Sequence, residues 1–210
     1  MIRRVCVLYE DQRGTTKGFG LHELVKACVG DALPEHPRWR INAALEDCRP
    51  LKGSAKLLEA CRRDIDLIAN DDRRVVAVFD HDRIHQLLRL PKNASDKQVV
   101  QTILAGGKKA HRLSIVLLKR NMESVLQAAA QCDESIALDR IKRAVQHKGP
   151  LERDAILNEL SSERARSVRD CILDQVPSLR TLIEVLSTQL TRPKGRRRTE
   201  TSERKHRAKL

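Results

Sequence analysis

The sequence predicts an α/β fold built on a mostly parallel four-stranded sheet with helices on both faces, followed by a C-terminal helical extension and a basic tail. Three observations support this prediction. Short apolar runs without polar alternation indicate strands that are buried on both faces. Stretches with apolar residues at helical spacing lie between these runs. After residue 131 no strand pattern remains, and helical patterns continue to residue 190.

The predicted strands are rich in β-branched residues. The clearest lie at residues 5–9 (VCVLY), 75–79 (VVAVF) and 113–118 (LSIVLL), and residues 39–45 (WRINAAL) are a weaker fourth candidate. Because these runs lack polar alternation, we expect strands of a parallel sheet that is covered on both faces.

The predicted helices alternate with these strands. One spans residues 21–32, a second is capped by Ser54, a third is capped by Ser95 and ends at Gly106-Gly107, and a fourth starts at Asn121. Serine and asparagine side chains accept hydrogen bonds from the free N–H groups of a first helical turn, and glycine ends helices. The resulting β-α alternation predicts right-handed crossovers and parallel strands.

We divide the chain into three parts. An α/β domain covers residues 1–130, a helical extension covers 131–190, and a disordered basic tail covers 191–210. Within the extension, helical patterns run over residues 135–146, 151–160, 162–175 and 178–188. Gly149-Pro150 and Pro177 punctuate them, since both residue types interrupt helices. The tail has no apolar periodicity, which is typical of disorder.

The charge of the chain is unevenly distributed. The formal net charge is +13, and residues 191–210 contribute +7 of it, which leaves a mildly basic body of +6. A basic excess favours a polyanionic partner such as nucleic acid. Aromatic residues make up only 2% of the chain, so a module that stacks bases on aromatic side chains is disfavoured.

The cysteines and the apolar runs suggest where the protein resides. None of the six cysteines lies within ten residues of another, which excludes a zinc ribbon or finger, and we expect reduced, buried thiols. No apolar run approaches the ~18 residues of a membrane span. The apolar part of the N-terminus is too short for a signal peptide. We therefore expect a soluble, cytoplasmic protein with no membrane partner.

Acidic residues follow the predicted strands. Glu10 and Asp11 end the first strand, Asp80 and Asp82 end the third, and Glu123 lies one turn into the helix after the fourth. Because ligands of open α/β sheets bind outside the carboxyl ends of the strands, these carboxylates point to one site. Clustered carboxylates repel one another unless a cation compensates them. Mg²⁺ or Mn²⁺ suits such oxygen ligands, so we predict a divalent metal site.

These residues resemble the Toprim domain of topoisomerases, primases, OLD-type nucleases and ribonuclease M5. The resemblance covers roughly residues 3–130: a Glu ends the first apolar strand and an Asp-x-Asp ends a later one. It implies that Glu10, Asp80 and Asp82 coordinate Mg²⁺ for phosphodiester chemistry, with Glu10 also acting as general base or acid. The segment LLKRNMES (residues 117–124) is similar to the last Toprim motif of stand-alone members associated with phage defence, and adds Glu123.

The sequence departs from that family at two places. Asp11 stands where the family usually has glycine, and the following loop, residues 12–20 (QRGTTKGFG), lacks the second acid of the nuclease branch. Either Asp11 substitutes as an auxiliary ligand, or a second metal site is weak. The single tyrosine, Tyr9, lies inside the first strand, which excludes a tyrosyl-DNA intermediate for this chain alone.

Two functions remain open. The first is a Mg²⁺-dependent nuclease that acts on DNA or RNA with a protein partner; the resemblance implies an ATPase, and the chain has no ATP-binding loop of its own. A homo-oligomer is the other expected partner. The second is a non-catalytic nucleic-acid-binding or scaffold subunit with a degenerate site. A small-nucleotide phosphohydrolase is a third hypothesis. Six basic residues are expected to contact phosphate: Lys17, Lys119, Arg120, Arg196, Arg197 and Arg198.

Overall fold

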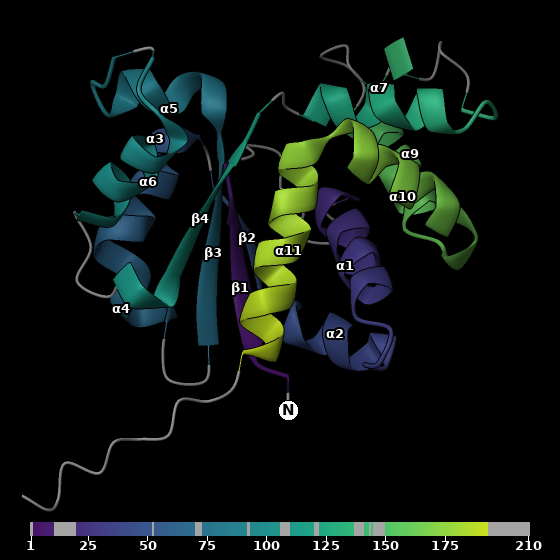
Figure 1. Ribbon diagram of the computed structural model, residues 1–210, viewed down its shortest axis with the longest axis horizontal. Coiled ribbons are helices and arrows are strands. Elements are labelled where there is room, and N and C mark those ends of the chain that lie inside the picture. The colour runs from purple at the N-terminus through teal and green to yellow at the C-terminus, as the bar shows by residue number, and fades with distance from the viewer. Residues whose placement is uncertain are drawn as a thin grey trace, which may run out of the picture.

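The structure is a computed structural model that describes residues 2–10, 20–51, 53–69, 73–91, 93–105, 110–119, 122–136, 141–142, 144 and 150–192. Within these ranges the chain forms a sheet covered by helices on both faces (Figure 1). The elements, in chain order, are β1 (Arg4–Tyr9), α1 (Gly20–Ala32), α2 (Arg38–Ala44), β2 (Cys48–Pro50), α3 (Ser54–Glu59), η1 (Ala60–Asp64), α4 (Ile65–Ile68), β3 (Arg73–Asp80), α5 (His81–Leu87), α6 (Asp96–Ala105), η2 (Ala110–Arg112), β4 (Leu113–Leu118), α7 (Met122–Cys132), α9 (Pro150–Leu160), η3 (Glu163–Ala165), α10 (Arg166–Gln175) and α11 (Pro177–Thr191).

The four strands are all parallel, which confirms the predicted fold class. Their order in the sheet is β2-β1-β3-β4. The register pairs Tyr9 with Val78 and Asp80 with Leu118, so the carboxyl ends of the central strands lie at one edge. After β1 the chain moves outward to β2, and it then crosses back to β3 on the other side of β1. The direction of winding therefore reverses between β1 and β3.

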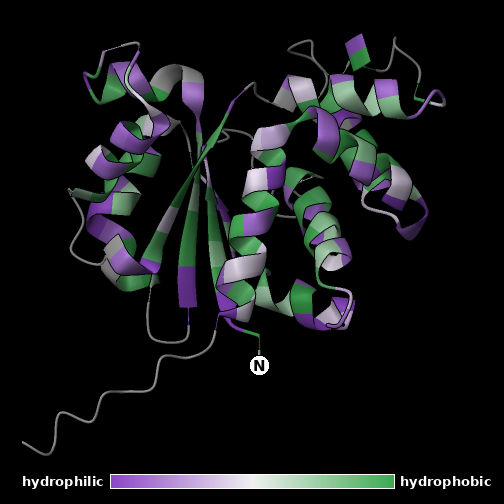
Figure 2. Ribbon diagram, viewed as in Figure 1, coloured by the Kyte–Doolittle hydropathy of each residue, from purple (hydrophilic) through white to green (hydrophobic). Residues whose placement is uncertain are grey.

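Helices cover the two faces of the sheet in two separate groups. Helices α3, α4, α5 and α6 lie on one side, and α1, α2, α7, α9, α10 and α11 lie on the other (Figure 1). The strands alternate accordingly: Val5 and Val7 belong to one buried cluster, and Cys6 and Leu8 belong to the other. Figure 2 shows that the central strands are predominantly hydrophobic along their length. Burial on both faces explains why these strands lack polar alternation.

The predicted strand at residues 39–45 is wrong. This segment forms the helix α2 after Pro37, and the fourth strand is the three-residue β2 instead. Ile41, Ala44 and Leu45 are buried, whereas Trp39 is 66% exposed. Burial at positions i, i+3 and i+4 is the pattern of a helix rather than of a strand. The short β2 carries too few residues to show a strand pattern in the sequence.

The two serine caps turn out differently. Ser95 caps α6 as predicted: its hydroxyl accepts from the N–H of Gln98 at 3.3 Å, and the Gln98 side chain accepts from the N–H of Ser95 at 2.9 Å. This reciprocal pair is a capping box. Ser54 makes no such cap, because Gly53 holds the N-cap position of α3 and the Ser54 hydroxyl points elsewhere. The proposed cap Asn121 lies outside the described residues.

The expectation that all cysteines are reduced is wrong for one pair. Cys132, the last residue of α7, forms a disulfide with Cys171 of α10, and their Cα atoms are 5.9 Å apart. The other four cysteines are free, and Cys6, Cys28 and Cys61 are buried. The bond joins two helices that pack side by side, but the two cysteines are 39 positions apart in the sequence, which gave no sign of the bond.

The C-terminal helices share a core with the sheet. Ile156 of α9 and Leu182 of α11 belong to the same buried cluster as Val5 and Val7 of β1. A buried ion pair adds to this packing: the Arg169 Nε of α10 donates to Asp31 Oδ2 of α1 at 2.6 Å. The 135–146 helix falls largely outside the described residues, as does the tail from residue 193. None of the described helices is long and apolar enough to cross a membrane.

Gly20, the first residue of α1, is expected to resist any side chain. An added Cβ would lie 2.9 Å from Leu157 Cβ and 3.1 Å from Asp154 Cα, both on α9. The variant Gly20→Ala should therefore lower the free energy of unfolding by roughly 1–3 kcal/mol, which is typical of overpacking. Urea denaturation followed by circular dichroism measures this change.

Gly30 provides the matched control in the same helix. An added Cβ there would meet Arg38 Cγ at an ordinary 3.6 Å. Gly30→Ala should therefore stabilise the protein by up to about 1 kcal/mol through helix propensity. Equal effects of the two substitutions would show that α9 does not pack closely against the start of α1.

Candidate functional site

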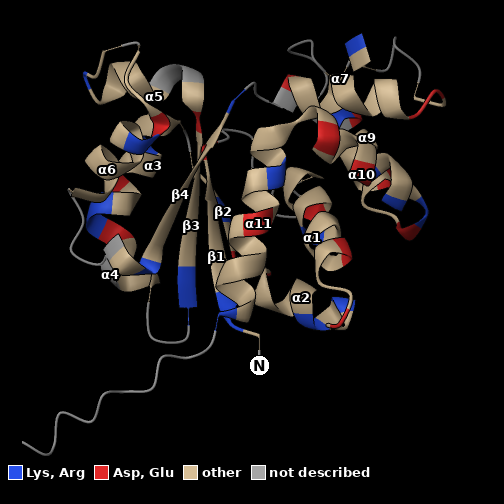
Figure 3. Ribbon diagram, viewed as in Figure 1, with Lys and Arg blue, Asp and Glu red and all other residues tan. Residues whose placement is uncertain are grey.

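The candidate site lies at the carboxyl ends of β1 and β3. The direction of winding reverses between these two strands, and ligands of open α/β sheets bind in the crevice at such a point. β3 begins with Arg73 and Arg74 and ends with Asp80. Figure 3 shows the resulting difference in charge, with basic residues at the lower end of β3 and an acidic residue at its upper end. The acidic residue of β3, Asp80, therefore lies at the end of the strand where a ligand would bind.

Glu10 is fixed in position by three parts of the chain. It follows directly after β1, and its Oε2 accepts the main-chain N–H of Asp80 at 2.8 Å. Its Oε1 accepts the hydroxyl of Ser54, the first residue of α3, at 2.5 Å. Its main-chain carbonyl accepts the N–H of Gly53 at 3.0 Å. These bonds hold the carboxylate between the ends of β1 and β3 and the start of α3.

The structure brings Glu10 and Asp80 together, while Asp82 differs from its expected setting. β3 ends at Asp80, and α5 begins at His81, so Asp82 is the second residue of a helix. Asp82 was expected at the end of the third strand, and only Asp80 lies there. Asp80 is half-buried. The side chain of Asp82 lies outside the description.

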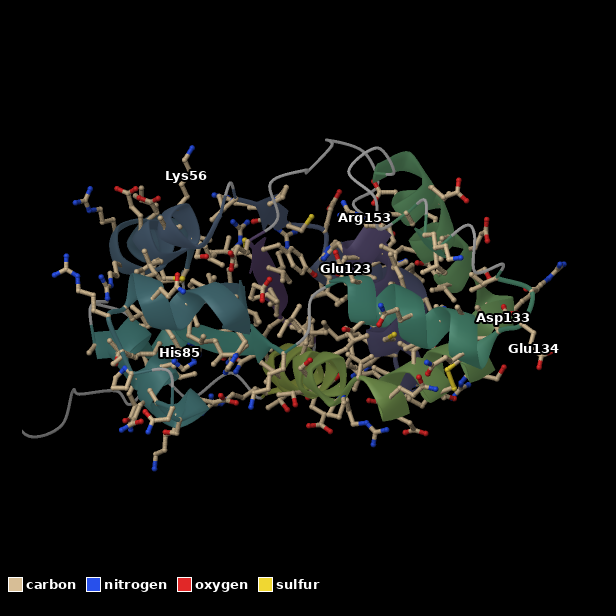
Figure 4. The ribbon with its side chains drawn as sticks, turned by 90° about the horizontal axis from the view of Figure 1, so that it is seen from above. Lys56, His85, Glu123, Asp133, Glu134 and Arg153 are labelled. Atoms are coloured by element: carbon tan, nitrogen blue, oxygen red, sulfur yellow. A yellow bond between two sulfur atoms is a disulfide. The ribbon has the colours of Figure 1, made fainter. Side chains whose placement is uncertain are left out.

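The remaining predicted residues are distributed unevenly. Glu123 is an exposed residue in the first turn of α7. Figure 4 looks along the strands from above, and Glu123 and His85 lie there on opposite sides of the strand ends. The other predicted residues lie outside the described part of the chain: Asp11, Lys17, Arg120, Arg196, Arg197 and Arg198.

Lys119, predicted to contact phosphate, belongs to a chain of polar contacts. Its Nζ lies 2.7 Å from Asp96 Oδ2, and Asp96 Oδ1 lies 3.2 Å from His81 Nε2. His81 Nε2 is in turn 3.4 Å from His85 Nε2, and His85 Nδ1 donates to the carbonyl of Pro91 at 3.2 Å. With His85 Nδ1 as a donor, its Nε2 accepts, so the Nε2–H of His81 is shared between Asp96 and His85.

The same contacts explain the acidity of Asp96. The hydrogen bond from Lys119 holds the pKa of the Asp96 carboxyl below its usual value, and His81 adds to this effect. Asp96 therefore stays ionised and keeps Lys119 close to β4. The sequence offered no sign of Asp96 in this role, because 15 residues separate it from His81. Ser54 was not predicted as a partner of Glu10 either, because it was expected to cap a helix.

The described residues fit a magnesium ion only in part. Among them, no group of three or more His, Cys, Asp and Glu side chains is placed to hold a metal ion. Magnesium, however, commonly binds one or two carboxylates and keeps several waters, so a complete protein cage is not required. Each oxygen of Glu10 has two lone pairs and uses one of them in the hydrogen bond described above. Glu10 therefore keeps lone pairs that a cation could use, and the half-buried Asp80 is bonded to it through its main-chain N–H.

A buried hydrogen-bond chain supports the end of β1. The hydroxyl of Tyr9 donates to His22 Nδ1 at 3.0 Å, and His22 Nε2–H donates to the carbonyl of Leu45 at 2.6 Å. Tyr9 and His22 are 2% exposed. Burial lowers the pKa of His22 from 6.5 to about 4, so the ring is neutral at pH 7. These hydrogen bonds connect β1 to α1 and to the end of α2. They begin at Tyr9, the residue before Glu10.

The comparison of this chain with family models, with curated proteins and with solved structures finds no match. The resemblance to the Toprim domain therefore rests on Glu10, on Asp80 and Asp82, and on the segment 117–124 alone. Function has to be argued from the geometry described above.

The buried His22 makes stability depend on pH. In the unfolded chain the imidazole binds a proton below pH 6.5, while the folded protein binds it only below about pH 4. Stability is therefore complete above pH 6.5 and falls as the pH decreases towards 4, by about 3 kcal/mol in total. Urea unfolding between pH 7.5 and 4 measures this loss.

The variant His22→Gln isolates the effect from that of other groups. The free energy of unfolding of the wild type, minus that of the variant, should decrease as the pH is lowered from 7.5 to 4. His111→Gln, at an exposed position, serves as the control and should leave the pH profile unchanged. A difference that stays constant with pH would show that His22 is not buried in its neutral form.

Proposed function

We propose that this protein is a Mg²⁺-dependent nuclease that hydrolyses phosphodiester bonds in DNA or RNA. The observation that carries the proposal is the contact between Glu10 and Asp80. The acidic residues that end β1 and β3 meet through the N–H of Asp80, 2.8 Å from Glu10 Oε2, at the point where the winding of the sheet reverses. Open α/β sheets bind ligands at this point. A carboxylate pair there suits a metal-dependent reaction on phosphate.

Each site residue has a distinct role in this proposal. Glu10 and Asp80 would hold the metal ion, and Asp82 and Asp11 are further ligands expected from the sequence. Glu123 was expected as well, but it does not form a metal-binding group with Glu10 and Asp80 among the described residues. Ser54 and the N–H of Asp80 fix the carboxylate of Glu10, so that it can accept a proton from an attacking water. When bound, Mg²⁺ would polarise a phosphate oxygen and lower the pKa of a bound water.

The charge of the chain supports a polyanionic substrate. The body carries +6 and the tail +7. Such an excess attracts phosphate backbones without reading base sequence. Lys119 is the one predicted phosphate contact whose position the structure describes. Its side chain is 57% exposed, and it would have to exchange Asp96 for a phosphate oxygen.

A protein partner and a cellular location complete the proposal. An ATPase or a second copy of the chain is the partner we expect, on the resemblance alone. A cytoplasmic location belongs to the proposal as well. The Cys132–Cys171 disulfide is the observation against it, because disulfides are rare in reducing compartments.

A second candidate function rests on the same hydrogen bonds. Both oxygens of Glu10 are already held by partners within the protein, and no group of three metal-binding side chains occurs among the described residues. This arrangement favours a non-catalytic subunit that binds nucleic acid or scaffolds a complex. Such a subunit would bind nucleic acid through its basic charge and leave it intact.

The cleavage reaction is tested with supercoiled plasmid, single-stranded circular DNA and an RNA transcript, each with Mg²⁺, Mn²⁺ or EDTA. The wild type should cleave at least one of them with metal and none with EDTA. Glu10→Gln and Asp80→Asn should each lower the rate by about a hundredfold or more, because the first removes the acid–base group and a metal ligand and the second removes a metal ligand. Both variants should keep the wild-type circular dichroism spectrum.

Glu59→Gln is the matched control, since Glu59 is an exposed α3 residue that pairs with Arg63 on the next turn. It should cleave at the wild-type rate. Wild-type cleavage by Glu10→Gln would contradict the assignment of the site. Binding of all three nucleic acids without cleavage by the wild type would favour the non-catalytic subunit.

A further inference from the structure

A groove runs along the outer edge of β4. It has a volume of about 900 Å³, and Ile115, Val116 and Leu117 of β4 line its floor. Residues of α6 line one side, and residues of α7, α10 and α11 line the other. In Figure 1, β4 lies between α6 on the left and α11 on the right. This volume is at the upper end of the range of about 300–1,000 Å³ for ligand pockets.

The two edges of the sheet differ in how well they are protected. β2, at one edge, has three residues, Cys-Arg-Pro, and shortness, charge and proline all discourage pairing with another strand. β4, at the other edge, reads LSIVLL, with no charge and no proline over six residues. Within the described residues, β4 pairs only with β3. The outer edge of β4 therefore carries main-chain N–H and C=O groups with which a further strand could pair, and its side chains carry no charge that would discourage such pairing.

The lining of the groove suits a polypeptide better than a nucleic acid. Its described hydrogen-bonding groups are mostly uncharged amides and hydroxyls, namely Gln101, Gln127, Gln131, Gln175, Ser124, Ser178 and Thr181. Among the described lining residues the cations are Lys97 and Lys119, and Lys119 is paired with Asp96. Among the described lining residues none is aromatic, whereas grooves for single-stranded nucleic acids combine positive charge with aromatic rings. Amide side chains instead match the donors and acceptors of a peptide main chain.

We propose that the groove binds an uncharged, extended segment of a partner protein, which pairs with β4 as a fifth strand. The main chain of the segment would bond to the outer edge of β4, which is the usual source of affinity in strand addition. Alternate side chains would contact apolar positions such as Val100 on α6 and Val176 before α11. This inference goes beyond the proposed nuclease reaction and does not depend on it.

The shape of the groove favours a single strand over a second copy of the chain. β4 is the floor, and helices rise on both of its sides. A second copy would have to bring its own β4, which carries the same helices, to the ~4.8 Å spacing of paired strands. One extended segment needs no such clearance. The groove also reaches Asp96 and Lys119, so a bound segment would end beside the candidate site.

The test uses a phage-displayed library of nonapeptides without Asp, Glu, Lys or Arg, selected against the full chain. The most enriched peptide is synthesised with a fluorophore, and its affinity is measured by anisotropy. Two derivatives carry main-chain N-methyl groups on the odd or on the even residues. Because every second N–H of an added strand faces β4, the two derivatives should differ in affinity by about tenfold or more. Equal affinities, or no enrichment, would overturn the proposal.

A pair of tryptophan variants locates the binding. Gln127→Trp places an indole in the groove from an exposed position on α7 and should lower the affinity for the peptide by about tenfold or more. Gln86→Trp, at an exposed position on α5 outside the lining, should have no effect. The same loss in both variants would contradict the assignment.

Sedimentation and hydrogen exchange distinguish the other occupants. The proposal predicts that Gln127→Trp leaves the oligomeric state of the peptide-free protein unchanged, and that peptide slows amide exchange in residues 113–118. A dimer that Gln127→Trp dissociates would assign the groove to a second copy. Protection of residues 113–118 by an oligonucleotide, and by no peptide, would assign it to nucleic acid. Either result would overturn the proposal.

Discussion

The main-chain N–H of Asp80 donates to the carboxylate of Glu10, and the architecture of the candidate site depends on this contact. It forms because β1 and β3 are parallel neighbours whose register pairs Tyr9 with Val78, so that the residues after them meet. Ser54, the first residue of α3, donates to the other carboxylate oxygen of Glu10. A shift of one residue in this pairing would turn the side chains of β1 to the opposite faces of the sheet and separate Glu10 from both partners.

The same register organises the rest of the carboxyl edge. β4 pairs with β3 up to Leu118, which puts Lys119 beside Asp96 and at the end of the groove along β4. The candidate site and the groove are thus two parts of one edge. The first gathers acidic and hydrogen-bonded groups between β1 and β3, and the second presents uncharged groups outside β4.

Sequence patterns predicted those parts of the fold that depend on burial. The strands at 5–9, 75–79 and 113–118 were predicted within a few residues, because a strand buried on both faces must be apolar throughout. Parallel pairing of these strands then predicts that Glu10 and Asp80 lie at one edge of the sheet. Residues 39–45 were misassigned since a short helix and a strand can share apolar residues. Ser54, Asp96 and the Cys132–Cys171 disulfide could not be predicted, because each depends on tertiary contacts between distant segments.

We propose that a divalent cation binds between Glu10 and Asp80. Crystals of the full chain soaked in Mn²⁺, with anomalous scattering recorded at the manganese edge, test it most directly. We expect an anomalous peak within metal–oxygen bonding distance of both carboxylates, and its loss in Glu10→Gln crystals. Wild-type crystals that show no manganese at Glu10, with the Ser54 and Asp80 hydrogen bonds intact, would contradict it.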